Sequence, residues 1–193
     1  MPKIILATAS PYRQEAFKFL NLDFIPEPSN IKEDFEGRPN NPEELVMHLA
    51  KLKAEAVAKN HNECIVIGFD SVGWFNNSIL EKPKTKVEAF ERIKSMSGKN
   101  FRFITGIHMI NLSKNKALSN VVTTNAEMRE LTEKEITNYL DNDPKFITTC
   151  LGYDPLQEYS CSFARRIEGS YNNLTRGIPL ETVIEMINKI IKQ

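Results

Sequence analysis

A turn near the start of the sequence combines residues that could bind a phosphate group. The β-branched run Lys3–Ala7 predicts a strand, and Ser10 and Pro11 then predict a helix start, with Ser10 as its cap. A helix N-terminus leaves backbone N–H groups without intrahelical partners, which suits an anion. Arg13 adds a guanidinium whose fork of donors matches phosphate oxygens. The simpler interpretation is an ordinary helix cap beside a surface arginine.

Asp70 is the second candidate, because it follows a continuous apolar run. Residues 64–69 read CIVIGF, which is typical of a strand buried on both faces, and we expect this strand to end at Asp70. Open α/β sheets bind ligands at the carboxyl ends of their strands. A carboxylate there could coordinate Mg²⁺ or activate a water molecule. A turn or capping aspartate is the simpler alternative.

Two charged loops supply further candidates. The acidic loop at residues 33–36 begins with Glu33 and Asp34, whose carboxylates could hold a metal ion or orient water. The basic loop at residues 82–86 contains Lys82, Lys84 and Lys86 around Pro83 and could neutralise a triphosphate. Surface charge explains both loops more simply. Lys53, inside a predicted helix, is most simply a solvated residue.

The composition excludes several classes of protein. The 193 residues include 25 basic and 25 acidic side chains, so no net charge favours binding to nucleic acid or to an acidic membrane. Three cysteines without a CxxC pattern, and three histidines without ligand spacing, favour neither a disulfide framework nor a zinc site. The apolar runs are too short to span a bilayer, and no signal segment is visible. We expect a reduced, cytoplasmic protein that binds neither nucleic acid nor membrane.

Strands and helices alternate along the chain. The predicted strands are Lys3–Ala7, Phe24–Ile25, Cys64–Phe69, Phe101–Leu112 and Ala117–Arg129, the last two as an antiparallel pair, with a hairpin turn at Asn76-Asn77. The predicted helices start at Pro11, at Pro42 (core stripe Leu45, Val46, Leu49, Leu52 and Ala56), after the capping boxes Thr85/Glu88 and Thr132/Glu135, and at about Leu180. This order predicts one α/β domain over residues 1–193 with a mixed sheet.

The same segments resemble, in order, those of the Maf family. The matching stretches are LATASPYRQEAFKFL, Glu33 in the acidic loop, LAKLKAEAV with Lys53, IGFDSV with Asp70, EKP with Lys82, SMSGKNFRFITGI and IEGSYNNLTRGIPL. Together they span nearly the whole chain. The resemblance implies a fold similar to the inosine triphosphate pyrophosphatases, which is a mixed twisted sheet with flanking helices and two lobes around a deep cleft.

The resemblance also implies a reaction and a role for each candidate. The reaction is Mg²⁺- or Mn²⁺-dependent hydrolysis of a small-molecule nucleoside triphosphate to the monophosphate and pyrophosphate, in a homodimer by family analogy. Ser10, Arg13, Lys53 and Lys82 would bind the phosphates. Glu33 and Asp70 would bind the metal, with Asp70 favoured for activating the water, and a one-residue shift would exchange Glu33 with Asp34.

Within the family, Tyr12 and the sequence Cys150-Leu151-Gly152 resemble the branch that prefers 7-methyl-GTP. The Tyr12 ring could stack on the cationic methylated purine. The chain departs from that branch at several positions, namely Ser71, Glu81, Pro155, Gln157 (a position expected to contact substrate) and Arg176. We therefore expect an active or weakly active pyrophosphatase with altered base preference. The alternatives are a nucleotide-binding regulator linked to cell division, with little or no turnover, and a dTTP/UTP pyrophosphatase.

Overall fold

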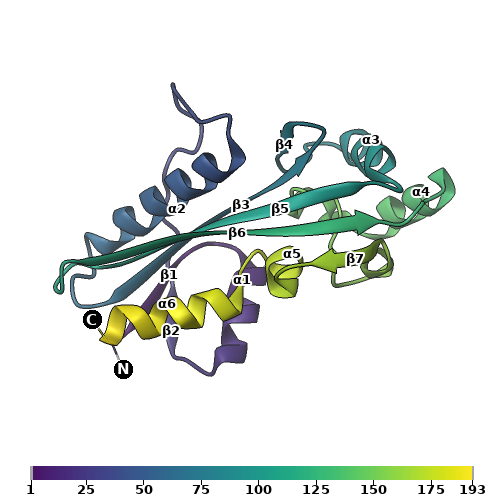
Figure 1. Cartoon of the computed structure of the whole chain (residues 1–193). Helices are drawn as coiled ribbons and strands as arrows, with labels where there is room; N and C mark the ends of the chain where they lie inside the picture. Colours follow the sequence, from purple (N-terminus) through teal and green to yellow (C-terminus); the bar gives the residue numbers. More distant parts are fainter. Residues whose placement is uncertain (1, 193) are drawn as a thin grey trace. The chain divides into compact units, whose positions relative to one another are not determined.

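The structure is a computed structural model that describes residues 2–192 (Figure 1). Its strands are β1 (Ile4–Ala7), β2 (Phe24–Pro26), β3 (Ile65–Phe75), β4 (Ser78–Leu80), β5 (Asn100–Asn111), β6 (Lys116–Met128) and β7 (Ala164–Glu168). Its α-helices are α1 (Pro11–Phe17), α2 (Pro42–Ala58), α3 (Lys86–Met96), α4 (Glu133–Asn142), α5 (Tyr171–Arg176) and α6 (Leu180–Lys192). Short 3₁₀ helices cover Lys18–Leu20, Pro144–Thr148 and Tyr159–Ser162. None of the described helices is both long enough and apolar enough to span a membrane.

The strands form a mixed sheet, as the sequence predicts. Their order is β2-β1-β3-β5-β6-β7, and β4 pairs with β3 outside this path. Strand β1 runs parallel to β2 and β3, whereas β4 is antiparallel to β3 and β7 is antiparallel to β6. The predicted neighbours β5 and β6 lie side by side in this order.

The described residues divide into two compact units. Unit 1 comprises residues 2–71, 104–122 and 176–192, and unit 2 comprises residues 72–103 and 123–175. Strands β3, β5 and β6 each contribute residues to both units. The single domain that the sequence predicts for these two units stays a prediction.

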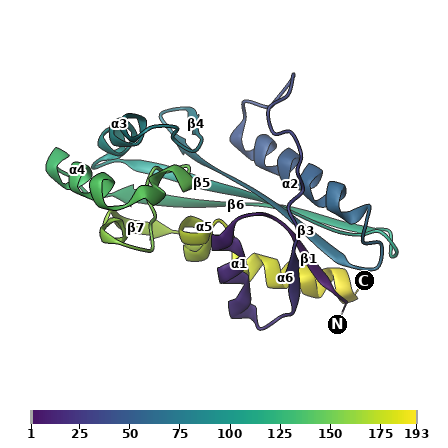
Figure 2. The ribbon, with the colours of Figure 1, turned by 180° about the vertical axis from the view of Figure 1, so that it is seen from behind.

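In unit 1, strands β1 and β3 are covered by helices on both faces, as Figures 1 and 2 show. Alternate residues of β1 face opposite sides: Ile4 and Leu6 pack with α1 and α6, whereas Ile5 and Ala7 pack with α2. Helix α2 lies very close to the sheet. A Cβ atom on Gly68 would lie 2.2 Å from the carbonyl oxygen of Ala50, and one on Gly106 would lie 2.3 Å from that of Val46. Glycine at these two positions therefore permits the close packing of α2.

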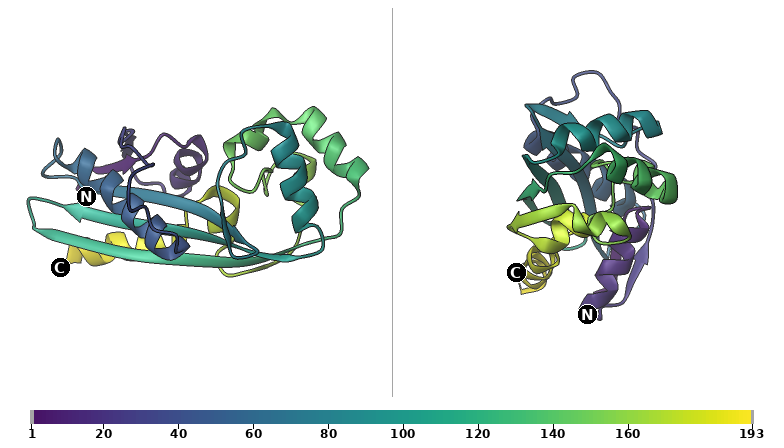
Figure 3. Two further views of the ribbon diagram at one scale, coloured as in Figure 1. Left: turned by 90° about the horizontal axis from the view of Figure 1, so that it is seen from above. Right: turned by 90° about the vertical axis from the view of Figure 1, so that its right-hand side faces the viewer.

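In unit 2, helices α3 and α4 lie beside each other and cover one face of the sheet (Figure 3). Their core positions include Ile93 of α3 and Tyr139 of α4, which join Phe101 of β5 and the fully buried Tyr153 and Phe163. Helix α4 starts with the predicted capping box of Thr132 and Glu135. Thr85 caps α3 as predicted.

The structure corrects several local expectations. Strand β3 does not end at Asp70 but continues to Phe75, since β5 is its second neighbour and its last three residues pair with β4 after its pairing with β1 ends at Gly68. The carboxylate of Glu88 accepts a hydrogen bond from the backbone N–H of Lys84, so the predicted capping box of α3 is incomplete. Two residues of the predicted α2 core stripe, Leu52 and Ala56, are only half-buried, since Ala50, Ala54 and Val57 complete the buried face instead. The sequence analysis also did not predict β7 or α5.

Candidate functional site

Three predicted site residues meet in unit 1. The ammonium of Lys53 on α2 lies 2.7 Å from Oδ1 of Asp70 on β3 and 2.8 Å from Oε1 of Glu33 in the acidic loop. The side chain of Lys53 is only 12% exposed, so its interpretation as a solvated residue is wrong. Asp34, by contrast, is exposed and forms no ion pair with the described residues. Of the two adjacent acids, the fold thus places Glu33 beside Lys53.

Asp70 is a buried carboxylate within a continuous strand. Burial raises the pKa of Asp70 above its ordinary value, while the nearby charges of Lys53 and Arg13 oppose this shift. Asp70 lies two residues beyond the last β1 partner of β3, Gly68, and three residues before its first β4 partner, Gly73. The carboxylate thus lies on a continuous strand, between the part that pairs with β1 and the part that pairs with β4.

Arg13 connects three segments of unit 1. Its Nε donates to the carbonyl of Gly177 at 2.8 Å, its Nη2 donates to Oγ of Ser71 at 2.7 Å, and its Nη1 lies 3.4 Å from the carbonyl of Phe69. Ser71 also hydrogen-bonds to Thr105 of β5 at 2.7 Å. The guanidinium therefore connects α1 with β3 and with the backbone before α6. From the sequence, Arg13 was expected to bind phosphate or to lie on the surface; its contacts with Gly177 and Ser71 were not predicted, because these partners are distant in sequence.

Ser10 caps α1, as predicted. Its hydroxyl accepts a hydrogen bond from the backbone N–H of Arg13 at 3.4 Å, and its own N–H donates to the hydroxyl of Thr8. Ser10 is half-buried. This part of the predicted phosphate-binding turn has the backbone geometry that the sequence indicates.

Tyr12 has a cationic neighbour in the protein itself. The guanidinium carbon of Arg176 lies 5.5 Å from the centre of the Tyr12 ring, which is a cation–π distance. Arg176 is buried, with 6% exposure. Arg176, where the chain departs from the 7-methyl-GTP branch, therefore lies against Tyr12, which resembles that branch.

The two remaining candidates belong to unit 2. Lys82 is exposed in the loop after β4. Gln157 is half-buried, and its backbone N–H donates to Oδ1 of Asp154 at 3.3 Å. The structure thus brings together Glu33, Lys53 and Asp70, and separately Ser10, Tyr12 and Arg13, within unit 1; Lys82 and Gln157 stay predictions as substrate contacts.

The acidic pair fits a hard divalent cation. Glu33 and Asp70 each direct a carboxylate oxygen at the same ammonium, so one cation can contact both. Mg²⁺ and Mn²⁺ prefer such oxygen ligands, and Mg²⁺ is commonly held by one or two carboxylates together with water and substrate phosphates. Among residues 2–192, no three His, Cys, Asp or Glu side chains come together as a metal cage.

Fold and site together define a class of α/β protein in which a buried carboxylate, a lysine and a second acid converge near the ends of parallel strands. Residues 3–190 match the model of the family described as Maf-like protein. The chain belongs to the Maf family.

Relatives of two substrate types resemble the chain. It is 36% identical over 187 residues to a dTTP/UTP pyrophosphatase of Clostridioides difficile, covering 96% of this chain and 94% of that protein. It is 33% identical over 190 residues to a 7-methyl-GTP pyrophosphatase of Pseudomonas syringae pv. tomato, covering 98% and 97%. Sequence identity therefore does not separate the two substrate branches.

A solved structure supports the expected fold. The structure of a HAM1 protein from Coxiella burnetii matches with a TM-score of 0.57 at 16% identity, covering 98% of this chain and all of that one. At this level of identity the likeness concerns the fold alone.

Proposed function

We propose that this chain is a nucleoside triphosphate pyrophosphatase, which hydrolyses the bond between the α- and β-phosphates and releases pyrophosphate. The observation that supports it most is the convergence of Asp70 and Glu33 on the Lys53 ammonium, in a chain of the Maf family. An acidic pair for a divalent cation and a lysine for phosphate charge are the parts that phosphoryl transfer needs.

Each candidate side chain has its own role in the proposed hydrolysis. Glu33 and Asp70 would hold Mg²⁺ or Mn²⁺, which supplies Lewis-acid polarisation of the phosphate oxygens when bound. Asp70 accepts the proton of the attacking water, as a carboxylate held within the site can. Lys53, once it contacts substrate, stabilises the negative charge that builds on the leaving pyrophosphate. Ser10, Arg13, Lys82 and Gln157 contact the substrate.

Different observations favour two substrate classes. Tyr12 and Cys150 favour 7-methyl-GTP, through the resemblance to that branch. The contact of Arg176 with Tyr12 favours dTTP or UTP, because a buried guanidinium on the ring repels a cationic purine and stacks against a neutral pyrimidine without that cost. The homodimer and the cytoplasmic location stay predictions.

The test is pyrophosphate release from 7-methyl-GTP, dTTP, UTP and ITP, with Mg²⁺ and with Mn²⁺. Asp70→Asn should lower kcat at least a hundredfold on every substrate, since it removes the base and a metal ligand. Asp34→Asn, the matched change at the exposed neighbouring acid, should leave kcat within about twofold, as is usual for a surface charge without a partner.

The two outcomes separate the proposal from its alternative. Turnover that Asp70→Asn abolishes and Asp34→Asn spares supports a pyrophosphatase and identifies its substrate class. Nucleotide binding without any release of pyrophosphate would overturn the catalytic proposal and leave the nucleotide-binding regulator.

A further inference from the structure

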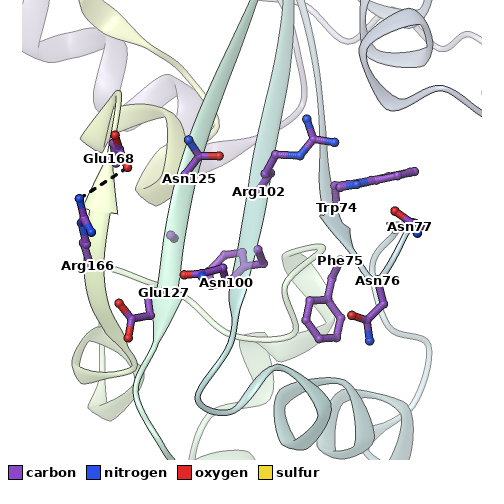
Figure 4. Close-up of a pocket in the computed structure, with 12 residues that line it drawn as sticks. Trp74, Phe75, Asn76, Asn77, Asn100, Arg102, Asn125, Glu127, Arg166 and Glu168 are labelled. Atoms are coloured by element: carbon purple, nitrogen blue, oxygen red, sulfur yellow. Dashed lines mark ion pairs between the residues drawn. The ribbon is translucent and has the colours of Figure 1, made fainter.

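Unit 2 contains a pocket of about 590 Å³ on the sheet face opposite α3 and α4. Trp74 of β3, Asn100 and Arg102 of β5 and Asn125 of β6 line it from three strands (Figure 4). Their neighbours along the strands, Phe75 and Phe101, also border the pocket, but they are buried in the core beneath α3 and α4. Because successive side chains of a strand point to opposite faces of the sheet, the pocket lies on the face opposite that core.

The side chains in this pocket are unusual for a solvated strand face. Asparagine is depleted in strands, yet Asn100 and Asn125 both line the pocket. Neither carboxamide forms a hydrogen bond with any described residue. The indole N–H of Trp74 likewise has no acceptor among residues 2–192. These groups are therefore available to a ligand.

The pocket also offers a surface for stacking. The guanidinium carbon of Arg102 lies 5.6 Å from the centre of the Trp74 ring. Guanidinium and indole planes are both surfaces on which planar heterocycles stack.

The charges of the pocket balance. Arg166 pairs with Glu168 at 3.8 Å, and Glu127 pairs with Arg165 at 3.7 Å. Two arginines and two glutamates line the pocket in total. The lining residues by themselves therefore carry no net charge that would attract a phosphate, which favours an uncharged ligand.

We propose that this pocket binds the base of an adenine nucleoside, independently of the triphosphate site in unit 1. The Trp74 and Arg102 planes stack with the ring. The carboxamides of Asn100 and Asn125 pair with its edges, because each carboxamide presents a donor next to an acceptor, as adenine does at N6 and N7.

The chain provides its own reporter, because Trp74 is its one tryptophan. The experiment titrates the full-length protein with adenosine, guanosine, uridine, AMP and glucose and follows the fluorescence of Trp74, with calorimetry as a second readout. Adenosine should quench the emission saturably. AMP should bind no more tightly than adenosine, since the pocket adds no charge for the phosphate.

Variants distinguish this pocket from the site in unit 1. Asn100→Ala and Asn125→Ala should each weaken adenosine binding roughly two- to tenfold, as expected for the loss of a neutral hydrogen bond, and should leave pyrophosphate release unchanged. Asn138→Ala, at an exposed asparagine of α4 outside the pocket, and Asp70→Asn should both keep wild-type adenosine affinity.

The inference is overturned if adenosine gives no saturable response in either readout, if glucose alone binds, or if all three nucleosides bind equally in the wild type and the Asn variants. Each of these results leaves the proposed pyrophosphatase untouched, because that activity is measured separately.

Discussion

Lys53 forms ion pairs with two acids of unit 1. Its ammonium contacts the buried carboxylate of Asp70 and the exposed one of Glu33. A buried carboxylate without a positive partner is costly, because it has lost its water and gained nothing in exchange. We therefore expect the lysine to stabilise the fold, together with the nearby charge of Arg13, as well as to bind phosphate as proposed.

Replacement of this lysine should show that dependence. We expect Lys53→Met to lower the free energy of unfolding by about 3 kcal/mol in urea denaturation at neutral pH, because Asp70 would stay buried without its partner. Lys51→Met removes an exposed pair with Glu55 on the same helix and should cost less than about 0.5 kcal/mol. The double variant Lys53→Met/Asp70→Asn should recover most of the loss, and a double variant as unstable as the single one would contradict this account.

Arg13 should also affect stability as well as binding. Its guanidinium contacts Gly177, Ser71 and Phe69, and an ammonium cannot reproduce this set of directions. Arg13→Lys is expected to cost about 2 kcal/mol, the usual contribution of hydrogen bonds from a charged group. Thermal melting beside the exposed Arg165→Lys measures this, and equal melting temperatures for the two variants would show that the contacts do not stabilise the fold.

At the scale of elements, helix α2 places Lys53 at the required depth through its close contact with the sheet. In Gly68→Ala the new Cβ would lie 2.2 Å from the Ala50 carbonyl, so the helix backbone must move. We expect a loss of at least roughly 1–3 kcal/mol, as for overpacked cores, together with a lower kcat as Lys53 shifts. In Gly73→Ala the new Cβ would meet only side-chain atoms, the nearest at 3.1 Å, so the loss of stability and of kcat should be smaller. Urea denaturation and pyrophosphate release measure both effects.

The capping box of α4 makes the stability of unit 2 depend on pH. The Thr132 backbone N–H, and then Arg129, lower the pKa of Glu135 from 4.5 to about 2. Since the folded state prefers the ionised acid, its stabilisation is complete above pH 4.5 and is lost as the pH falls toward 2. The melting temperature of Glu135→Gln should therefore lie below that of the wild type at neutral pH. The difference in melting temperature between the two proteins should become smaller as the pH falls from 4.5 toward 2. A difference that does not change with pH would exclude the ionised carboxylate as its source.

These elements show where sequence reasoning works and where it stops. The caps of α1 and α4 were predictable because their donors and acceptors lie within three residues of one another. The end of β3 was not predictable, because the strand continues beyond β1 through pairing with distant segments: β5 is its other neighbour, and β4, a strand too short to have been recognised, pairs with its last three residues. The pairing of Lys53 with Asp70 and that of Arg13 with Gly177 depend on packing between distant segments, so local pattern gave these residues a solvated or ligand-binding role instead.

At the scale of the whole molecule, strands β3, β5 and β6 contribute to both units. We propose that the chain is one cooperative domain, because a strand that unfolds in one unit also loses pairing in the other. Trp74 reports on unit 2, whereas far-ultraviolet circular dichroism reports on helices and strands of both units. The two signals should give the same urea midpoint, and midpoints that differ would show that the units unfold separately.

Unit 1 is built from segments that the ribosome makes at different times. Residues 2–71 supply α1, Arg13 and Lys53, but Gly177 and the apolar face of α6 emerge only after all of unit 2 has been synthesised. Domains usually fold in the order of their synthesis, and here that order cannot hold for unit 1. A nascent chain therefore lacks the Gly177 partner of Arg13, and the β1 residues Ile4 and Leu6 stay uncovered by α6 until α6 has been synthesised, whereas Ile5 and Ala7 can already pack against α2.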